Sequence, residues 1–549
     1  MGFTIARSSF NESLIVIAVG GAAALYFKPE YAIGSSRPVT AVILVILITL
    51  AKIIYELFLY PKFFTPLIGI PTPADWHFLK GNGNTGLVDT PHDLIREWAQ
   101  TIPNNGLIRY YIVGQIERVV LTDPKAYSEI LVTKAYDFVK PEVARQQLRR
   151  VVGDGLLLAE GDEHKFQCKN LMPAFAYRHI KDLYPIFWAK SSEMVKLIRR
   201  DLEARESTED NTIQVRGYAS RATLDIIGLA GMGHDFDSLE NPDNDLYQSY
   251  RAIFTPGDAF ARILFMIGML ICDMRLVQKL PTKRNRAITK GREVISRVAR
   301  QMVREKKAKM EDPKADAGID IISVAMTSGT FEEENLIDQL MTFLAAGHET
   351  TSGALQWCIY ALCKNPKVQD RLREEVHANL PPINVENPEP ITAGAIDDIS
   401  YLNAVCNEVL RFYPSVRNTV RVAVKDTSIL GQPIPKDTFL IPSVDLLNHS
   451  PELWGPDADK FNPDRWMAPG QANTGGATSN YAFMTFLHGP HSCIGQSFSR
   501  SELACLLAAV VGSFKFEFKY PDAELKLRRA ATVTPLDGVL AKFTPLEGW

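Results

Sequence analysis

A glycine-framed loop around one cysteine constrains this chain more than any other segment. Residues 486–495 read Phe-Leu-His-Gly-Pro-His-Ser-Cys-Ile-Gly, and a stretch typical of a helix follows from Gln496. Gly489 and Gly495 leave room for the backbone to turn beneath a flat macrocycle. The N–H groups of the turn and of the helix start can stabilise negative charge on the Cys493 sulfur. Because a thiolate opposite an open iron position favours O–O cleavage, the loop predicts a haem-thiolate site. The alternative is that Cys493 is only a small buried hydrophobic residue.

The composition narrows the class of protein. Of 549 residues, 46% are hydrophobic and 22% are charged, as in an ordinary globular protein with a large core. The net charge of −3 gives no reason to expect a nucleic-acid partner. The seven cysteines are scattered and include no C-x-x-C pair, which argues against a disulfide framework or a zinc site.

The first 62 residues predict a membrane anchor. Residues 14–27 form an uncharged apolar run, and residues 39–60 form a second run that only Lys52 and Glu56 interrupt. The second run is long enough to span a bilayer, whereas the first is marginal, so one or two spans are possible. The prolines within residues 63–74 predict a stiff hinge, followed by a catalytic domain over residues 75–549.

The catalytic part is predicted to be mainly α-helical with small β-sheets. Residues 110–114 and 118–121 alternate like paired strands around a turn at 114–117, and strand patterns return near 421–430 and 433–442. Residues 81–86 fit G-x-G-x-x-G, but no strand precedes them and no helix follows, so we interpret them as a turn. The chain therefore carries no recognisable nucleotide site for its own electron source.

A long helix is predicted to begin at Thr330, with Glu333 completing a capping box. Its middle reads Ala-Gly-His-Glu-Thr-Thr over residues 346–351. A mid-helix acid and hydroxyl beside small residues are poor choices for stability alone. A Thr350 hydroxyl bonded to the preceding turn would loosen the helix and help to deliver protons. A solvated polar stripe is the alternative.

Glu408 and Arg411 lie three residues apart on a predicted helix, close enough to touch. Such a pair is common on surfaces, where it contributes little. It gains meaning only as part of a buried network, for which Arg465 in Phe-Asn-Pro-Asp-Arg-Trp (461–466) is the candidate third member.

In their order along the chain, these four segments resemble the cytochrome P-450 family of haem-thiolate monooxygenases. The resemblance covers residues from about 75 to the end. It implies the P-450 fold, a haem b cofactor and Cys493 as the axial iron ligand. It also implies that Thr350 and Glu349 relay protons, and that Glu408, Arg411 and Arg465 support the haem loop without acting as catalysts.

The resemblance assigns further cofactor and substrate contacts. It implies that the haem is bound by a set of residues that includes a propionate-binding arginine: Arg421, His491, His164, Phe486, Gly489 and Gly495. His491 stands where the family usually has arginine, and Cys168 stands where a second arginine is common, so propionate binding is expected to be weaker and pH-dependent. Pocket residues are expected to include Ala345, Ala346 and Val416.

The implied reaction inserts one atom of dioxygen into a C–H or C=C bond of a lipophilic substrate, which we expect to be a fatty acid, terpenoid or other secondary metabolite. The apolar residues 259–272 fall where the family has its substrate-access lid, although an ordinary buried helix is the alternative. The sequence as a whole resembles the fungal members of the family.

Electrons are expected from a separate NADPH-cytochrome P-450 reductase, with cytochrome b5 as a second possible donor. The reductase is expected to dock near Lys165, Lys169 and Arg500. The implied location is the endoplasmic reticulum membrane, with the catalytic domain on the cytosolic side.

Two other functions compete with monooxygenation. One is a haem-thiolate isomerase or dehydratase that does not use dioxygen, and the intact Glu349–Thr350 pair argues against it. The other is a non-catalytic membrane haem-binding protein.

Overall fold

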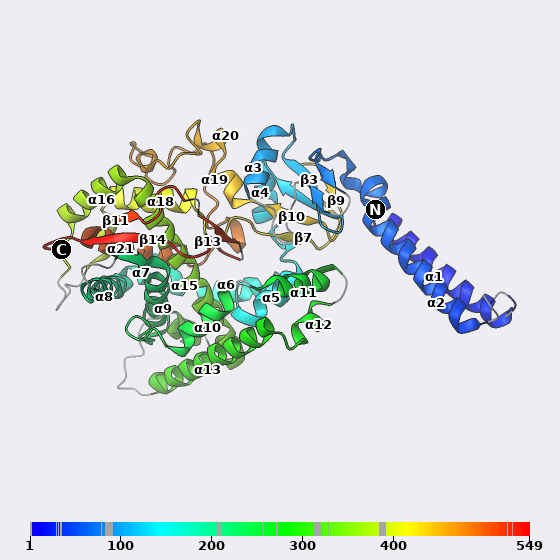
Figure 1. Cartoon of the computed structure of the whole chain (residues 1–549), viewed down its shortest axis with the longest axis horizontal. Coiled ribbons are helices and arrows are strands. Elements are labelled where there is room, and N and C mark those ends of the chain that lie inside the picture. The colour runs from blue at the N-terminus through cyan, green and yellow to red at the C-terminus, as the bar shows by residue number, and fades with distance from the viewer. Residues whose placement is uncertain are drawn as a thin grey trace. The chain divides into compact units, whose positions relative to one another are not determined.

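The computed structural model describes residues 3–549 apart from 29, 31, 33–35, 78–79, 83–91, 206–209, 256, 271–272, 312–319, 328, 384–390, 524 and 530. The predicted turn at 81–86 therefore lies mostly outside the described residues. The chain forms two compact units: residues 1–141 with 418–446, and residues 142–417 with 447–549. The prediction of a mainly helical protein with small sheets is confirmed (Figure 1).

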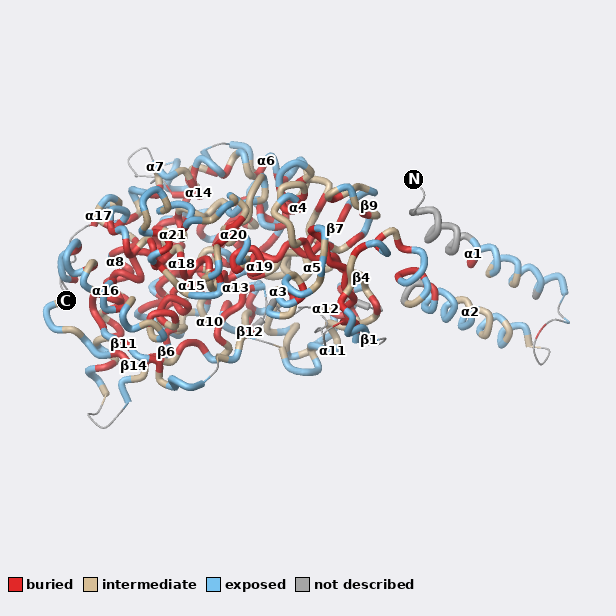
Figure 2. The backbone as a smooth tube through the Cα atoms, turned by 90° about the horizontal axis from the view of Figure 1, so that it is seen from above, coloured by how far each residue is buried: buried red, intermediate tan, exposed pale blue. Residues whose placement is uncertain are grey.

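The first unit begins with two helices, α1 (Phe3–Phe27) and α2 (Arg37–Ile54), which lie side by side (Figure 1). A π-helix, η3 (Tyr55–Phe64), continues α2 across Pro61. The combined segment Arg37–Phe64 is long and apolar enough to cross a membrane, by length and composition. Most of its apolar residues are exposed, and α2 is drawn largely in the pale blue of exposed residues in Figure 2.

A five-stranded sheet forms the centre of the first unit, in the order β3-β4-β10-β7-β5. The strands β4 and β10 run parallel, and the other neighbours are antiparallel. The bounds of its strands are β3 (Leu107–Ile112), β4 (Ile116–Leu121), β5 (Phe138–Val139), β7 (Arg421–Ala423) and β10 (Phe439–Pro442). The predicted hairpin around Gly114 is present, because Leu107 pairs with Leu121 and Ile112 with Ile116.

The segment 421–430, where strand patterns were predicted, does form strands. It divides into β7 and β8 (Thr427–Ile429), and β8 pairs with β9 (Gln432–Ile434) as a separate hairpin. Leu430 and Gly431 have φ angles of +49° and +80° and turn the chain between β8 and β9. The smaller elements of this unit are η4 (Pro66–Gly69), β1 (Trp76–His77), β2 (Gly81–Asn82), α3 (His92–Thr101), α4 (Pro124–Ser128), η5 (Glu129–Thr133) and η6 (Ala135–Asp137).

The second unit is built around one long buried helix, α15 (Glu333–Lys364), which packs against α9 (Val215–Met232) and α21 (Gln496–Ser513). All three helices are buried over most of their length, which Figure 2 shows for α15 and α21. Gly347 allows the close approach to α9, because an added Cβ would lie 2.8 Å from Cγ1 of Ile227. The helix begins later than predicted. Its N-cap residue makes no side-chain cap bond, and the Glu333 carboxylate pairs with Lys307 instead, so the capping box is wrong.

Further helices and two small sheets complete the second unit. The sheets are β11-β14-β6 and the hairpin β12-β13. The helix α19 (Val444–Asn448) starts in the first unit and ends in the second, and α20 (Pro451–Trp454) leads into the long loop before α21. The bounds of the other elements are α5 (Glu142–Val152), α6 (Gly161–Leu171), η7 (Met172–Phe175), α7 (Tyr177–Ile180), η8 (Lys181–Leu183), α8 (Tyr184–Glu203), β6 (Thr212–Gln214), α10 (Asp245–Phe254), α11 (Ala259–Leu270), α12 (Met274–Lys279), α13 (Lys283–Glu311), α14 (Ile321–Thr327), α16 (Pro366–Asn379), α17 (Ala393–Asp397), α18 (Ser400–Phe412), η9 (Pro463–Trp466), η10 (Gly489–His491), β11 (Phe514–Phe518), β12 (Leu527–Arg529), β13 (Val533–Pro535) and β14 (Leu540–Pro545).

Candidate active site

The cysteine loop is closed by its own backbone. The N–H of Cys493 donates to the carbonyl of Phe486 (2.8 Å), and the N–H of Ser492 donates to the carbonyl of Gly489 (3.0 Å). Gly489 has a φ of +74°, a conformation that a residue with a side chain adopts only with strain. The helix α21 then starts at Gln496, so the sulfur lies at the junction of a tight turn and a helix N-terminus.

The Cys493 side chain is exposed, whereas Cys358, Cys406 and Cys505 are buried. The alternative of a small core residue therefore does not fit Cys493. Burial nevertheless raises the pKa of the Cys493 thiol, and a hydrogen bond from the Gly495 backbone acts in the opposite direction. Cys493 is thus an exposed residue whose thiol is poorly solvated, and a cation opposite the sulfur would favour the thiolate.

The middle of α15 also carries exposed residues. Its residues from Leu336 to Ala345 are almost all buried, but Ala346 is exposed and Thr350, one turn later on the same face, is half-exposed. The Thr350 hydroxyl donates to the carbonyl of Ala346 (2.8 Å), which is the local bond that the sequence suggested. Val416 is 36% exposed, whereas Ala345 is 4% exposed. The exposed positions are those of small or aliphatic residues.

Glu349 lies beside Thr350 in sequence but has different partners. Its carboxylate forms a buried ion pair with Arg528 on β12 and accepts a hydrogen bond from the Thr532 hydroxyl (3.2 Å). Arg528 also donates to the carbonyl of Phe254, the last residue of α10 (2.9 Å). Sequence reasoning missed Arg528, because no local pattern marks a partner 179 residues away.

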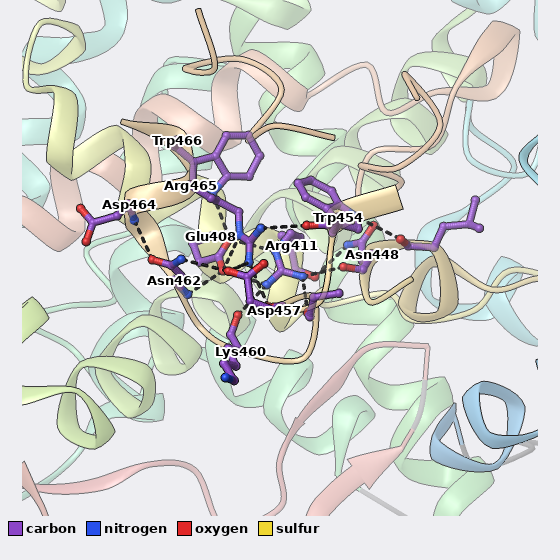
Figure 3. Close-up of polar contacts among 12 residues, drawn as sticks. Glu408, Arg411, Asn448, Trp454, Asp457, Lys460, Asn462, Asp464, Arg465 and Trp466 are labelled. Carbon is purple, nitrogen blue, oxygen red and sulfur yellow. Dashed lines mark hydrogen bonds and ion pairs between the residues drawn. The ribbon is translucent and has the colours of Figure 1, made fainter. Parts of the chain in front are cut away.

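Glu408, Arg411 and Arg465 meet in one buried cluster (Figure 3). Arg411 holds both carboxylate oxygens of Glu408 (2.8 and 2.9 Å), and Arg465 donates to one of them (3.2 Å). The indole of Trp466 and the backbone N–H of Asn462 supply two more donors to the same carboxylate. Glu408 and Arg411 are both 0% exposed, so the pair is not a surface ion pair.

Asn448 belongs to this cluster (Figure 3) and also binds the segment that leads into the cysteine loop. Its carbonyl accepts from Arg411 (2.7 Å), while its side-chain amide donates to the Arg411 carbonyl and to the Thr485 hydroxyl (2.9 Å each). Its side-chain oxygen accepts from the N–H of Met484 (2.8 Å). Phe486, which closes the loop, follows directly. Sequence reasoning missed this asparagine.

His164 and His491 stack on each other, with ring centroids 4.1 Å apart. The Nε2 of His491 lies 3.4 Å from a carboxylate oxygen of Glu160, which is a neighbour that the sequence did not suggest. Cys168 is half-exposed on the same helix as His164.

The cationic residues that were expected to bind the reductase or the haem differ in their surroundings. Lys165 is exposed and pairs with Asp162 (2.7 Å), and Lys169 is exposed as well. Arg500 lies over the rings of Phe483 and Phe486 (5.3 Å each), and burial lowers the pKa of its guanidinium. Arg421 belongs to the first unit, where it is 3% exposed on β7 and donates to the Thr419 hydroxyl (2.8 Å).

Comparisons with known proteins agree with this reading of the sequence. The profile of the cytochrome P450 family matches residues 71–540. The chain is 63% identical to cytochrome P450 monooxygenase sphH of Aspergillus fumigatus, over 97% of this chain and 98% of the relative. It is 39% identical to cytochrome P450 monooxygenase FSL4 of Gibberella zeae, over 90% of this chain and 91% of the relative. It is also 39% identical to cytochrome P450 monooxygenase FUM15 of Gibberella moniliformis, over 91% and 92%. The chain therefore belongs to the cytochrome P450 family, as a monooxygenase with fungal relatives.

Proposed function

We propose that this protein is a haem b monooxygenase in which the Cys493 thiolate is the axial iron ligand. The observation that carries the proposal is the setting of Cys493. The residue is exposed, its loop is closed by backbone hydrogen bonds, and burial raises the pKa of its thiol. The exposed face of Ala346 and Thr350 on an otherwise buried helix fits a flat cofactor and a substrate within the same unit. Bound haem iron supplies the activation of dioxygen.

The protein's own groups supply support, protons and a pocket. The Glu408–Arg411–Arg465 cluster, acting through Asn448, holds the segment before Cys493 in place. Thr350 positions a hydroxyl on the exposed face of α15, and Glu349 provides the acid beside it, held by Arg528. His491 and His164, with Phe486, Gly489 and Gly495, are the proposed haem contacts of the second unit.

The proposed reaction inserts one oxygen atom of dioxygen into a C–H or C=C bond, and the other atom leaves as water. A pocket with walls such as Ala346 and Val416 suits a lipophilic substrate, and the fungal relatives named as monooxygenases are compatible with secondary metabolism. Electrons come from a separate NADPH-cytochrome P450 reductase, with cytochrome b5 as a second donor. The apolar segment Arg37–Phe64 would anchor the protein in the endoplasmic reticulum membrane, facing the cytosol.

The visible spectrum of the reduced, carbon-monoxide-bound protein tests the ligand. Wild type should give the red-shifted band of a thiolate ligand, and Cys493→Ala should lose it. Cys363→Ser, a change at a half-buried cysteine of α15, is the matched control and should keep the band. A histidine-type band in folded wild type would exclude the assignment. Dependence of turnover on reductase and NADPH then separates a monooxygenase from an isomerase or a non-catalytic protein.

A further inference from the structure

The C-terminal end of the membrane-length segment Arg37–Phe64 is bonded to the five-stranded sheet of the first unit. The carbonyl of Pro61, in the last turn of η3, accepts a hydrogen bond from the Arg109 guanidinium (3.4 Å) and another from the Tyr111 hydroxyl (3.2 Å). Arg109 and Tyr111 are two residues apart on β3, so their side chains project from the same face of the strand. The last carbonyls of a helix have no partner within it and carry partial negative charge. The guanidinium therefore stabilises this helix end both as a donor and as a cation.

Arg109 is itself fixed by further contacts. It is only 8% exposed, and its guanidinium pairs with Glu117 of β4 (3.3 Å) and donates to the Thr72 hydroxyl (3.3 Å). Its backbone N–H donates to the carbonyl of Pro71 (2.9 Å). One residue of the sheet thus binds the chain at Pro61 and again ten residues later. Because the charge of Arg109 is already balanced by Glu117, its place beside the helix end leaves no unpaired cation inside the unit.

The proline segment, residues 61–73, is bound along its whole length. Each of its four prolines has a carbonyl that accepts a hydrogen bond from the rest of the first unit. The donors are Arg109 and Tyr111 for Pro61, the Gln432 amide for Pro66 (3.0 Å), the Arg109 backbone for Pro71 and the Asn82 amide for Pro73 (3.0 Å). Between these prolines, Leu67 and Ile70 are 2% and 4% exposed. A proline-rich linker is stiff by itself, and here the sheet also holds it in place.

Large apolar side chains are exposed at the same end of the membrane-length segment. These exit residues are 40–58% exposed and comprise Leu59, Phe63, Phe64 and Ile68. A helix rises about 1.5 Å per residue and the hydrocarbon core of a bilayer is about 30 Å thick, so about 20 residues cross it. The segment Arg37–Phe64 has 28 residues, and its last turns therefore extend into the headgroup layer. Aromatic and basic side chains are favoured in that layer, and the Lys62 ammonium lies 5.6 Å from the centre of the Phe63 ring.

We propose that Arg109 and Tyr111 fix the membrane segment rigidly to the five-stranded sheet, with the exit residues in the headgroup layer of a phospholipid bilayer. The sheet then keeps one height and one tilt at the membrane surface instead of moving on a flexible tether. The contact with phospholipid rests on the membrane anchoring that is part of the proposed function. The fixed attachment does not, because all of its hydrogen bonds lie within the chain.

Distances between two nitroxide labels, measured by pulsed electron paramagnetic resonance on the full-length protein, test the fixed attachment. Non-natural amino acids carry the labels in place of Val45, an exposed residue of α2, and Lys125, an exposed residue of α4. In detergent and in phosphatidylcholine nanodiscs, wild type should give one narrow distance distribution.

Arg109→Met combined with Tyr111→Phe should broaden this distribution at least about twofold, because the proline segment loses its hold on the helix end. Tyr111→Phe alone removes one hydroxyl and keeps the ion pair of Arg109, so it should cause part of the broadening in a folded sheet. Lys425→Met removes an exposed cation of the same unit and is the matched control, which should leave the width unchanged. A broad distribution in wild type, or an unchanged width in both Tyr111 variants, would overturn the fixed attachment.

Quenching by nitroxide-labelled phosphatidylcholine tests the contact with phospholipid. A fluorescent residue in place of Phe63 should be quenched more by a label on the headgroup than by a label at the end of the acyl chain. The same reporter in place of Val45 should show the reverse order, and in place of Lys125 it should respond to neither label. A Phe63 reporter that neither label quenches, beside a Val45 reporter that responds, would refute the headgroup contact. A Val45 reporter that responds to neither label would instead refute the proposed anchoring, and the distances in detergent would still decide the fixed attachment.

Discussion

Replacing Arg411 by lysine should destabilise the protein severely although the charge is kept. The guanidinium has five N–H donors, and the structure uses all of them: two on Glu408 and one each on the carbonyls of Asn448, Ala458 and Lys460. An ammonium group has three donors at a single point, so at least two buried acceptors lose their partner.

The magnitude follows from these contacts. Each buried acceptor left unsatisfied costs about 1–3 kcal/mol, so Arg411→Lys should lower the free energy of unfolding by roughly 2–6 kcal/mol. That is a large part of the roughly 5–15 kcal/mol typical of a folded domain. Urea unfolding, followed by tryptophan fluorescence and by loss of the thiolate-type carbon-monoxide band, measures it. Because Asn448 also holds Met484, the band should be lost at a lower urea concentration than in wild type.

The matched control is Arg371→Lys. Arg371 pairs with Asp464 (2.5 Å) on the surface, where its side chain is 48% exposed, so the change should cost less than about 1 kcal/mol. The free energy of unfolding of Arg411→Lys could instead stay within about 1 kcal/mol of wild type, as expected for the control. The five hydrogen bonds of the guanidinium would then not be what stabilises this cluster, and the reasoning would be wrong.

Three further changes test other parts of the second unit. Arg528→Gln leaves Glu349 buried without its cation and should lower the free energy of unfolding by roughly 3–5 kcal/mol; a double-mutant cycle with Glu349→Gln that shows no coupling would contradict this. Gly347→Ala places a Cβ 2.8 Å from Ile227 and should cost about 1–3 kcal/mol in thermal unfolding, most of which Ile227→Ala should restore. Burial raises the pKa of Asp225 to about 6, so the folded state binds more protons than the unfolded state between roughly pH 4 and 6. Its contribution to stability is therefore present at pH 4 and is lost as the pH rises through 6, by roughly 3 kcal/mol in total. Asp225→Asn should remove this pH dependence, and an unchanged pH profile of urea unfolding would exclude the assignment.

Local patterns predicted the elements and failed at their ends. The hairpin of β3 and β4 followed from alternation around Gly114, and the long helix followed from its apolar periodicity. The start of that helix was placed three residues too early. Its expected capping residue, Glu333, pairs with Lys307 of another helix instead of capping the N-terminus of α15. A tertiary ion pair of this kind overrides a local signal.

The site was predicted where its members lie close in sequence. Glu408 and Arg411 are one turn apart and form the expected ion pair, whereas Cys493 as the iron ligand stays a prediction. Asn448 and Arg528 were missed for a physical reason. Asn448 acts through its side-chain amide and its backbone carbonyl, and no local sequence pattern marks these contacts. Arg528 is distant from Glu349 in sequence and contacts it only in the folded chain.

The dependence of the cysteine loop on Asn448 has a consequence for how the protein is made. Glu408, Asn448 and Thr485 come from distant parts of the chain. Their contacts offset the entropy lost on loop closure only after the segments between them have folded. The loop should therefore acquire its final shape late in folding. Until then Cys493 is an unrestrained thiol, open to oxidation and with nothing to orient it towards a cofactor. Slow synthesis, reducing conditions and an early supply of haem should raise the yield of intact protein more than a faster expression system would.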